Sequence, residues 1–231
     1  MPCSSSGPPH ASLCITRSLR CVTTSKGDHL ETEQKYDADA DFVLPKLGSL
    51  PDLGGRRAAD PKRIYLSATY FDTGDLALIQ HKITLRRRVG GDDEGWHLKL
   101  PVRKDTRQEL HTPLDEDASG GVPARLADQV EEITAGRPLR PVAILDTERT
   151  VVTLSGPSGA PLAEVADDLV TAVRLGEPDS GPMKWREIEV EAMSPDPEAA
   201  AMLESVGQVL REAGARPSAS GSKLARVLNA G

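Results

Sequence analysis

Aromatic residues are scarce in this chain, at 3% of its 231 residues, whereas hydrophobic residues of all kinds make up 38%. A buried core must therefore be mostly aliphatic, and the length suits one domain with an additional tail. No apolar run approaches the roughly 18 residues that a membrane-spanning helix needs, which argues against a membrane protein. The formal net charge of −7 argues against broad binding to nucleic acid but leaves room for a local cationic pocket.

Cysteine is missing from most of the chain, because Cys3, Cys14 and Cys21 all lie in the first 21 residues. An odd number at one end forms no disulfide framework, so we expect a reducing, cytoplasmic setting. Residues 1–26 are rich in serine and proline, and their apolar stretch is too short and broken for a good signal peptide. We interpret residues 1–26 as a disordered extension or an artefact of an assumed start site, and residues 27–231 as the folded domain.

Short β-type runs separated by turn signals dominate the folded part. Strands are expected at 28–36, 64–73, 83–89, 95–102, 106–114, 141–154, 161–173 and 184–192. Helices are expected between Asp39 and Gly48, within 74–82, at 123–136, at 196–214 and from residue 222. The prediction is an α+β domain of about eight strands. Because turns join most of the strands, the sheet should be largely antiparallel and could close into a barrel.

Charged residues alternate along several of these strands. Side chains on a strand point to opposite faces in turn, so Glu31, Glu33 and Lys35 in "HLETEQKYDA" share one face. The same alternation groups further charged residues strand by strand: Glu187 with Glu189 and Glu191, Arg86 with Arg88, His97 with Lys99, Glu164 with Asp168, and Arg149 with Val151.

Two arrangements explain this alternation. A sheet with one wet face carries such a pattern routinely, and its cross-strand ion pairs contribute about 0.2–1 kcal/mol each. Three features favour a charged interior instead: the acids cluster as E-x-E, the bases cluster on two hairpin strands, and the opposite faces carry apolar residues such as Trp96, Leu98, Leu100, Ile188 and Val190. A barrel with those apolar faces outward, under helices, would enclose the charges. Since burying an unpaired ion costs several kcal/mol, that interior would need water, a divalent metal for the acids and a polyanion for the bases.

The sequence resembles the CYTH family, the superfamily of class IV adenylate cyclases and thiamine triphosphatases that is also called the triphosphate tunnel metalloenzymes. "ETEQK" fits the family's E-x-E-x-K signature, and "TYFDT", "LRRR", "GWHLKLP", "REIEVE" and "SKL" follow in the family's order, over roughly residues 29–228. The resemblance implies an α+β fold with a closed eight-stranded antiparallel β-barrel, helices packed on its outside, and triphosphate bound in the tunnel with Mg²⁺ or Mn²⁺.

The resemblance also implies roles for individual residues. The metal ligands would be Glu31, Glu33, Glu187 and Glu189, with Asp168 as a further acidic position. The phosphate-binding residues would be Lys35, Arg86, Arg88, Lys99, Arg149 and Lys223. The catalytic residues would be Glu31, Glu33, Lys35, Arg86 and Arg88. The register at "REIEVE" leaves open whether Glu187 and Glu189, or Glu189 and Glu191, form the metal-binding pair.

We expect a metal-dependent triphosphatase that acts on inorganic tripolyphosphate or on an organic triphosphate such as thiamine triphosphate. The alternatives are a non-catalytic polyphosphate-binding module and, less favoured, an adenylate cyclase, since the sequence has no distinctive nucleoside pocket. A pure polyanion binder would not need four carboxylates, which favours chemistry. The expected partner is a small-molecule triphosphate or polyphosphate rather than nucleic acid or a membrane, and no pattern in the sequence addresses the oligomeric state.

Three polar residues near the predicted site are open to two interpretations. Arg107 and Glu109 share a face of one strand and could join the tunnel, although a surface ion pair is the favoured reading. His97 shares the face of Lys99 and could carry a proton, although a plain polar lining is favoured.

Overall fold

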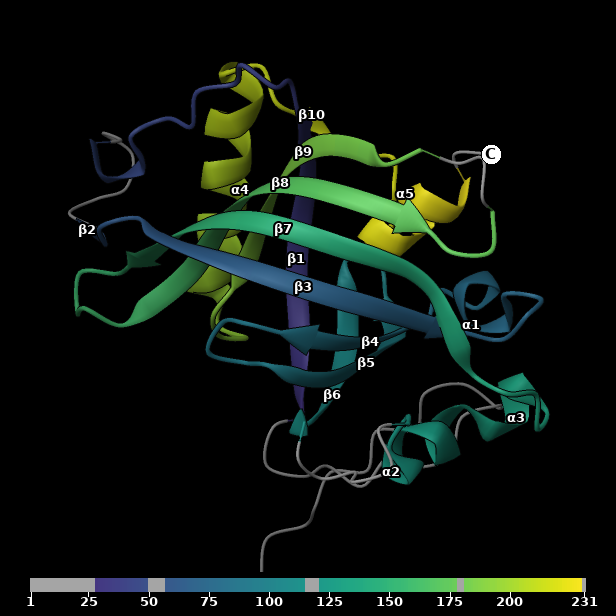
Figure 1. The fold of residues 1–231 in the computed structure, drawn as a ribbon. Helices are drawn as coiled ribbons and strands as arrows, with labels where there is room; N and C mark the ends of the chain where they lie inside the picture. Colours follow the sequence, from purple (N-terminus) through teal and green to yellow (C-terminus); the bar gives the residue numbers. More distant parts are fainter. Residues whose placement is uncertain (1–27, 50–56, 115–120, 178–180, 230–231) are drawn as a thin grey trace, which may run out of the picture.

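The computed structural model describes residues 28–49, 57–114, 121–177 and 181–229, so the expectation for residues 1–26 lies outside the described residues (Figure 1). Eight long strands form the body of the molecule: β1 (His29–Ala38), β3 (Lys62–Asp72), β4 (Thr84–Val89), β5 (Gly95–Arg103), β6 (Thr106–Thr112), β7 (Arg140–Ser155), β8 (Pro161–Arg174) and β9 (Met183–Ala192). Two short strands, β2 (Arg57–Ala58) and β10 (Arg216–Pro217), pair with β7 and β1.

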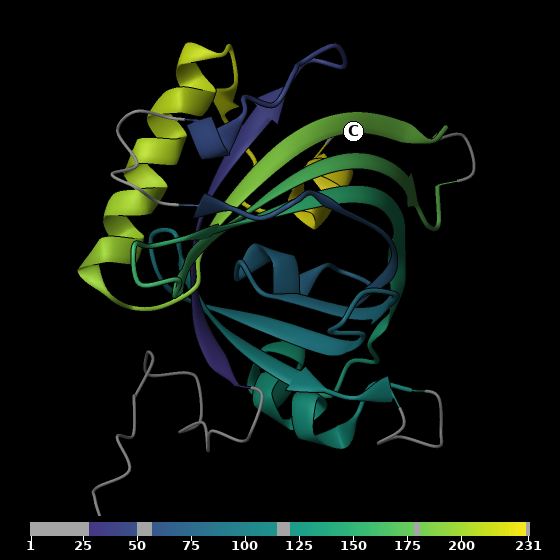
Figure 2. The same cartoon turned by 90° about the vertical axis from the view of Figure 1, so that its left-hand side faces the viewer.

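The long strands close into an antiparallel barrel in the order β1-β6-β5-β4-β3-β7-β8-β9, as the sequence predicts. Strand β1 closes it by pairing with β6 through its first half, where Leu30 lies opposite Gln108. Its second half pairs with β9, where Gln34 lies opposite Val190. The view in Figure 2 looks toward the strands as they curve around the interior.

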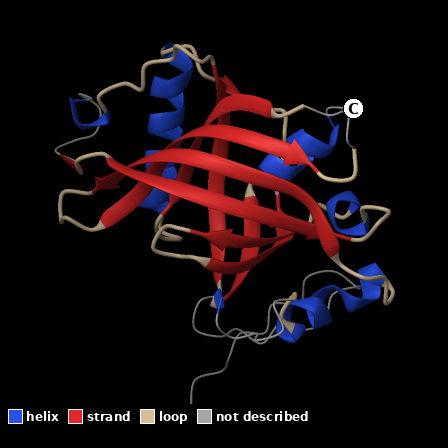
Figure 3. Ribbon diagram, in the orientation of Figure 1, coloured by secondary structure: helices blue, strands red, loops and turns tan. Residues whose placement is uncertain are grey.

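Five α-helices are present in the described part of the chain: α1 (Ala77–Gln80), α2 (Ala124–Ala127), α3 (Glu131–Thr134), α4 (Pro197–Glu212) and α5 (Lys223–Asn229). The single helix expected at 123–136 is instead α2, a 3₁₀ turn at Asp128–Val130 and α3. Figure 3 shows these helices against the red strands of the barrel. Among the described residues, no helix has the length and apolarity that crossing a membrane requires.

The helix predicted between Asp39 and Gly48 is wrong. This segment is a turn followed by irregular chain, and only Leu47–Ser49 forms a 3₁₀ turn. Arg186 donates hydrogen bonds to the backbone carbonyl oxygens of Ala40 and Phe42, which a helix would use internally. Pro45 also lacks an N–H group and disfavours helical dihedral angles in the residue before it.

The apolar faces of the strands point outward under helices, as predicted. Ile188 and Val190 of β9 are fully buried against α4, whose Met202 and Val206 are equally buried. A second outer core places Trp96, Leu98 and Leu100 of β5 beneath Leu78, which belongs to α1, and Leu126, which belongs to α2. Each fully buried aliphatic side chain contributes about 1.5–3 kcal/mol to stability, so the helices stabilise the barrel from outside.

A third apolar cluster lies inside the barrel at one end. Leu224 and Val227 of α5 pack there against inward-facing Leu145 of β7 and Val170 of β8. Figure 2 shows α5 beneath the arch of β7, β8 and β9. This end of the interior is therefore filled with side chains rather than open.

The turn after β3 is organised by Asp72. The Asp72 carboxylate is fully buried and accepts hydrogen bonds from the backbone N–H groups of Thr73 at 2.7 Å, Leu78 at 2.8 Å and Ile79 at 3.0 Å. These donors would otherwise be unsatisfied at the start of α1. Asp72 thus fixes the angle at which the chain leaves the barrel.

We expect Gly207→Ala in α4 to reduce the free energy of unfolding by about 1–3 kcal/mol, because the added methyl group would overlap with an already packed side chain. A Cβ atom at this position would collide with Tyr36 Oη and lie 2.8 Å from Gln34 Oε1. Urea denaturation measures the change. Elsewhere in a helix the same substitution stabilises by up to about 1 kcal/mol.

Combining Gly207→Ala with Tyr36→Phe is the matched control for this prediction. Removing the hydroxyl oxygen should recover much of the lost stability. Wild-type stability in the single variant would contradict the proposed close packing.

Candidate functional site

The inward faces of the strands enclose a charged cavity of about 140 Å³. Nine of the residues expected from the sequence line it: Glu31, Glu33, Lys35, Arg86, Arg88, Lys99, Arg149, Glu189 and Lys223. The other two, Asp168 and Glu187, are buried beside the cavity, where each contacts the ammonium group of Lys223. The barrel therefore brings all eleven residues into one connected charged region.

Strands β1 and β9 bring acids and a lysine face to face. Their register places Glu33 opposite Glu191 and Lys35 opposite Glu189. Lys35 Nζ lies 2.9 Å from Glu33 Oε2 and contacts Glu189 Oε1 directly. Burial alone would lower the pKa of Lys35, but Glu189 and Glu33 outweigh it and raise the pKa. Lys35 is therefore charged and holds the two carboxylates together.

Lys223, at the start of α5, is the centre of a second group. Its Nζ lies 2.9 Å from Asp168 Oδ2, 2.7 Å from Glu187 Oε1 and 2.8 Å from Glu189 Oε1. Arg149 closes the group with two 2.7 Å hydrogen bonds to Asp168 and one of 2.7 Å to Glu189. Burial raises the pKa of the Asp168 carboxyl, but Lys223 and Arg149 more than reverse this and lower it below the usual value.

The opposite wall, on β4, carries two arginines on neighbouring inward positions. Arg86 Nη1 lies 3.4 Å from Tyr70 Oη, and Arg88 contacts the Asp93 carboxylate. The Nε atoms of both arginines are buried and have no acceptor among the described residues. Burial, together with the positive charges of Arg86 and Arg149, lowers the pKa of Arg88 to about 9. The Nε donors of these arginines therefore remain available for a further acceptor.

Glu109 and Arg107 of β6 also belong to the interior, so the favoured surface ion pair is wrong. Glu109 is 3% exposed, and its Oε2 lies 3.0 Å from Lys99 Nζ, which also lies 2.6 Å from Glu31 Oε2. Arg107 Nη1 donates to Glu33 Oε1 at 3.0 Å. The register that places Glu109 directly opposite Lys99 is the signal that a paired-hairpin analysis could have used.

His97 lies beside Glu109 and is 1% exposed, but it is not among the residues that line the cavity. Its Nδ1 contacts Glu109 Oε1. Burial lowers the pKa of His97 to about 3, despite the neighbouring carboxylate. The choice between a polar lining and a proton carrier for His97 stays a prediction.

Within the described parts of the chain, two groups of side chains are close enough to share a metal ion. The first group is His29, Glu31 and Glu109, and the second is Asp168, Glu187 and Glu189; within each, one ligand atom per residue lies within 4.8 Å of the others. Glu191 is not in either group but faces Glu33 on β1 and Glu164 on β8. Burial and the nearby Glu31 raise the pKa of Glu191 to about 7. The choice between the Glu187–Glu189 and Glu189–Glu191 pairs stays a prediction.

Comparison with known proteins agrees with this architecture. The model of the CYTH domain family matches residues 29–226. The chain belongs to the CYTH domain family. It is 42% identical over 212 residues to two uncharacterized proteins of Mycobacterium tuberculosis, MT2285 of strain CDC 1551 / Oshkosh and Rv2226 of strain ATCC 25618 / H37Rv. Each match covers 87% of this CYTH chain, which spans about 40% of the length of these curated relatives.

A solved structure of a candidate adenylate cyclase from Bacillus halodurans has the same fold. It aligns with a TM-score of 0.56 at 17% sequence identity, covering 87% of this chain and 98% of that one. At 17% identity this similarity supports the fold alone. The description of the site in this CYTH domain is therefore based only on the residues of this chain.

We expect Lys223→Met to lower the free energy of unfolding by about 3–5 kcal/mol, because it removes the cation that the buried carboxylates of Asp168, Glu187 and Glu189 share. Added Mg²⁺ should recover part of this loss, since a divalent ion among Asp168, Glu187 and Glu189 would replace the missing charge. Urea denaturation with and without MgCl₂ measures both effects. Lys46→Met, at an exposed lysine, is the matched control, and equal stability of the two variants would contradict the prediction.

Proposed function

We propose that this protein hydrolyses a triphosphate, either inorganic tripolyphosphate or an organic triphosphate such as thiamine triphosphate, with Mg²⁺ or Mn²⁺. The observation that carries the proposal is that Arg86 and Arg88 line the cavity and that each keeps a buried Nε donor without an acceptor among the described residues. A phosphate oxygen is the acceptor that a planar guanidinium fits best.

The carboxylates supply the second half of the argument. Mg²⁺ and Mn²⁺ prefer carboxylate, water and phosphate oxygens, and Asp168, Glu187 and Glu189 bring such oxygens within 4.8 Å of one another. Glu31 and Glu33 would contribute further oxygens from β1, which pairs with β9. When bound, the metal would neutralise phosphate oxygens and help to activate the attacking water.

The residues of the chain would hold the substrate in place for in-line attack of water on a terminal phosphorus. Arg86, Arg88 and Lys99 would bind phosphate oxygens from β4 and β5, while Lys35, Arg149 and Lys223 would bind them from the other side. Phosphoryl transfer needs mainly positioning and charge neutralisation, and these six cations can supply both. The arginines would also stabilise the diphosphate that leaves.

A panel of substrates tests the proposal. The protein is incubated with tripolyphosphate, thiamine triphosphate and ATP, with Mg²⁺ or Mn²⁺, and phosphate, diphosphate and cyclic AMP are followed. Metal-dependent phosphate release from a triphosphate is the expected result. Tight polyphosphate binding without turnover would establish a binding module instead, and cyclic AMP with diphosphate would establish a cyclase.

We expect the double variant Glu31→Gln, Glu33→Gln to lose metal-dependent phosphate release by about 100-fold or more, because its amides keep the shape but not the charge of the carboxylates. Initial rates at saturating metal measure the loss, and the melting temperature confirms folding. The exposed pair Glu132→Gln, Glu212→Gln is the matched control. Unchanged release in the tunnel variant would refute the proposed role of these acids.

A further inference from the structure

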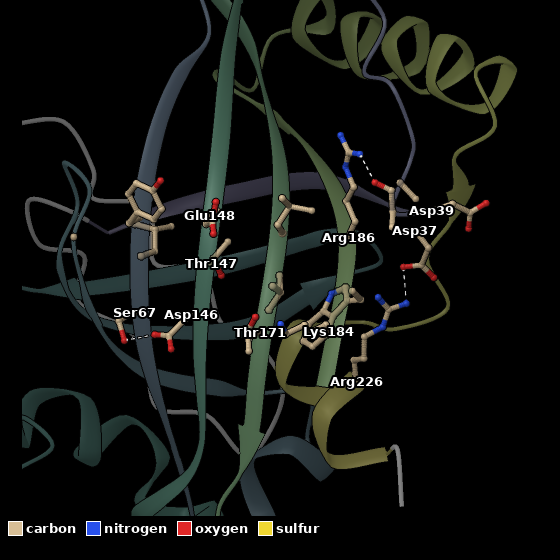
Figure 4. Close-up of a pocket in the computed structure, with 18 of the residues that line it drawn as sticks. Asp37, Asp39, Ser67, Asp146, Thr147, Glu148, Thr171, Lys184, Arg186 and Arg226 are labelled. Atoms are coloured by element: carbon tan, nitrogen blue, oxygen red, sulfur yellow. Dashed lines mark hydrogen bonds and ion pairs between the residues drawn. The ribbon is translucent and has the colours of Figure 1, made fainter. Parts of the chain in front are cut away.

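One part of the outer barrel surface has no helix of the described chain over it, in contrast to the faces under α4 and under α1 to α3. It consists of the outward faces of β3, β7, β8 and the first part of β9, which form the floor of a trough of about 1040 Å³ (Figure 4). Large apolar side chains stand exposed on and beside it: Tyr65 is 64% exposed, Leu169 48%, Val89 42%, Val173 39% and Ile144 37%. An exposed apolar area of this kind marks an interaction surface.

The charges on this face are arranged in an ordered way across the strands. Asp146 on β7 lies opposite Thr171 on β8, which lies opposite Lys184 on β9. One row further along, Glu148, Leu169 and Arg186 follow in the same strand order. Acids thus stand on β7 and bases on β9 at matching positions, as the labelled residues in Figure 4 show. Between them β8 presents Thr171 and Leu169, and further along the strand it presents Asp167, whose carboxylate already forms a two-fold hydrogen-bonded ion pair with Arg186.

Asp146 and Lys184 are too far apart to neutralise each other within one molecule, whereas Arg186 is already paired with Asp167. Lys184 has no ion pair among the described residues, and two strand spacings of about 4.8 Å separate β7 from β9. Asp146 accepts one hydrogen bond, from Ser67 Oγ at 2.7 Å, which leaves its negative charge without a cation. A partner that covers β8 could place a basic side chain over Asp146 on β7 and an acidic side chain over Lys184 on β9. Each of these two charges would then have a counter-charge.

We infer that this face is the interface of a two-fold symmetric dimer of the chain. A two-fold axis running along β8 turns the face upon itself and sets the partner's β7 above β9. The partner's Asp146 then faces Lys184. Along the axis, Leu169 and Val173 meet their own copies, which gives the apolar centre and polar rim of an ordinary interface.

This assignment stands on the outer surface alone and is independent of the proposed hydrolysis. Two sheets packed face to face lie about 10 Å apart with strands nearly aligned, and an axis along β8 gives that alignment. The interface leaves the cavity lining untouched. Dimerisation and phosphate release can therefore be lost separately.

Sedimentation equilibrium of the full chain over a concentration series tests the dimer. The wild type should fit a monomer–dimer equilibrium based on its mass of 24.7 kDa. Leu169→Arg, which sets two cations against each other on the axis, should leave only monomer. Met193→Arg, at a residue 45% exposed outside this face, is the matched control and should dimerise as the wild type does.

A charge exchange makes the test specific for the proposed pairing. Asp146→Lys alone and Lys184→Asp alone should each weaken dimerisation by about tenfold or more, because like charges then face each other. The double variant, which restores opposite charges with exchanged positions, should recover the affinity of the wild type. Only monomer in the wild type at every concentration, or a dimer indifferent to Leu169→Arg, would overturn the assignment, as would a double variant weaker than both single variants.

Discussion

The need to compensate buried charge is the constraint on which the rest of this structure depends. An interior that holds Glu31, Lys99 and Glu109 within ion-pair distance of one another cannot also be the hydrophobic core. The apolar faces of the strands must therefore point outward, and each then needs a cover that excludes water. This explains why α4 and the short helices α1 to α3 lie on the outside, and why few aromatic residues suffice: the cores are thin layers between strand and helix.

The ion pairs of the interior also bear on how ligands would bind. Lys35 and Lys223 are occupied by carboxylates, so a phosphate chain alone would have to compete with Glu189 for both. A divalent cation alone would have to displace those same ammonium groups. If both ligands enter together, each carboxylate exchanges a lysine for a metal and each lysine exchanges a carboxylate for phosphate, which leaves the charges balanced. We therefore expect triphosphate and metal to raise each other's affinity, as linkage requires.

The alternation of charged and apolar residues predicted which side chains share a face of each strand, because successive side chains on a strand point to opposite faces. The clustering of acids and bases and the resemblance to the CYTH family were also needed to predict the closed barrel with its charges inside. The local sequence could not show that the segment after Asp39 is not a helix. Its backbone carbonyl oxygens accept hydrogen bonds from Arg186, which lies far away in the sequence. Glu109 was missed for a related reason: one carboxylate on a mixed strand gains meaning only from its register with Lys99. The local sequence pattern thus predicted which face of a strand each side chain occupies. Contacts between distant segments determined which further residues belong to the site.

Helix α5 joins the two kinds of stabilisation in one short element. Leu224 and Val227 fix it by apolar contact inside the end of the barrel, and Lys223, one residue earlier, is thereby placed among three carboxylates. A lysine on a freely moving segment would remain hydrated and would neutralise these acids only weakly. Apolar packing at the closed end therefore determines the charge balance beside the cavity, so a change in that packing would be felt first as a change in the electrostatics of the site.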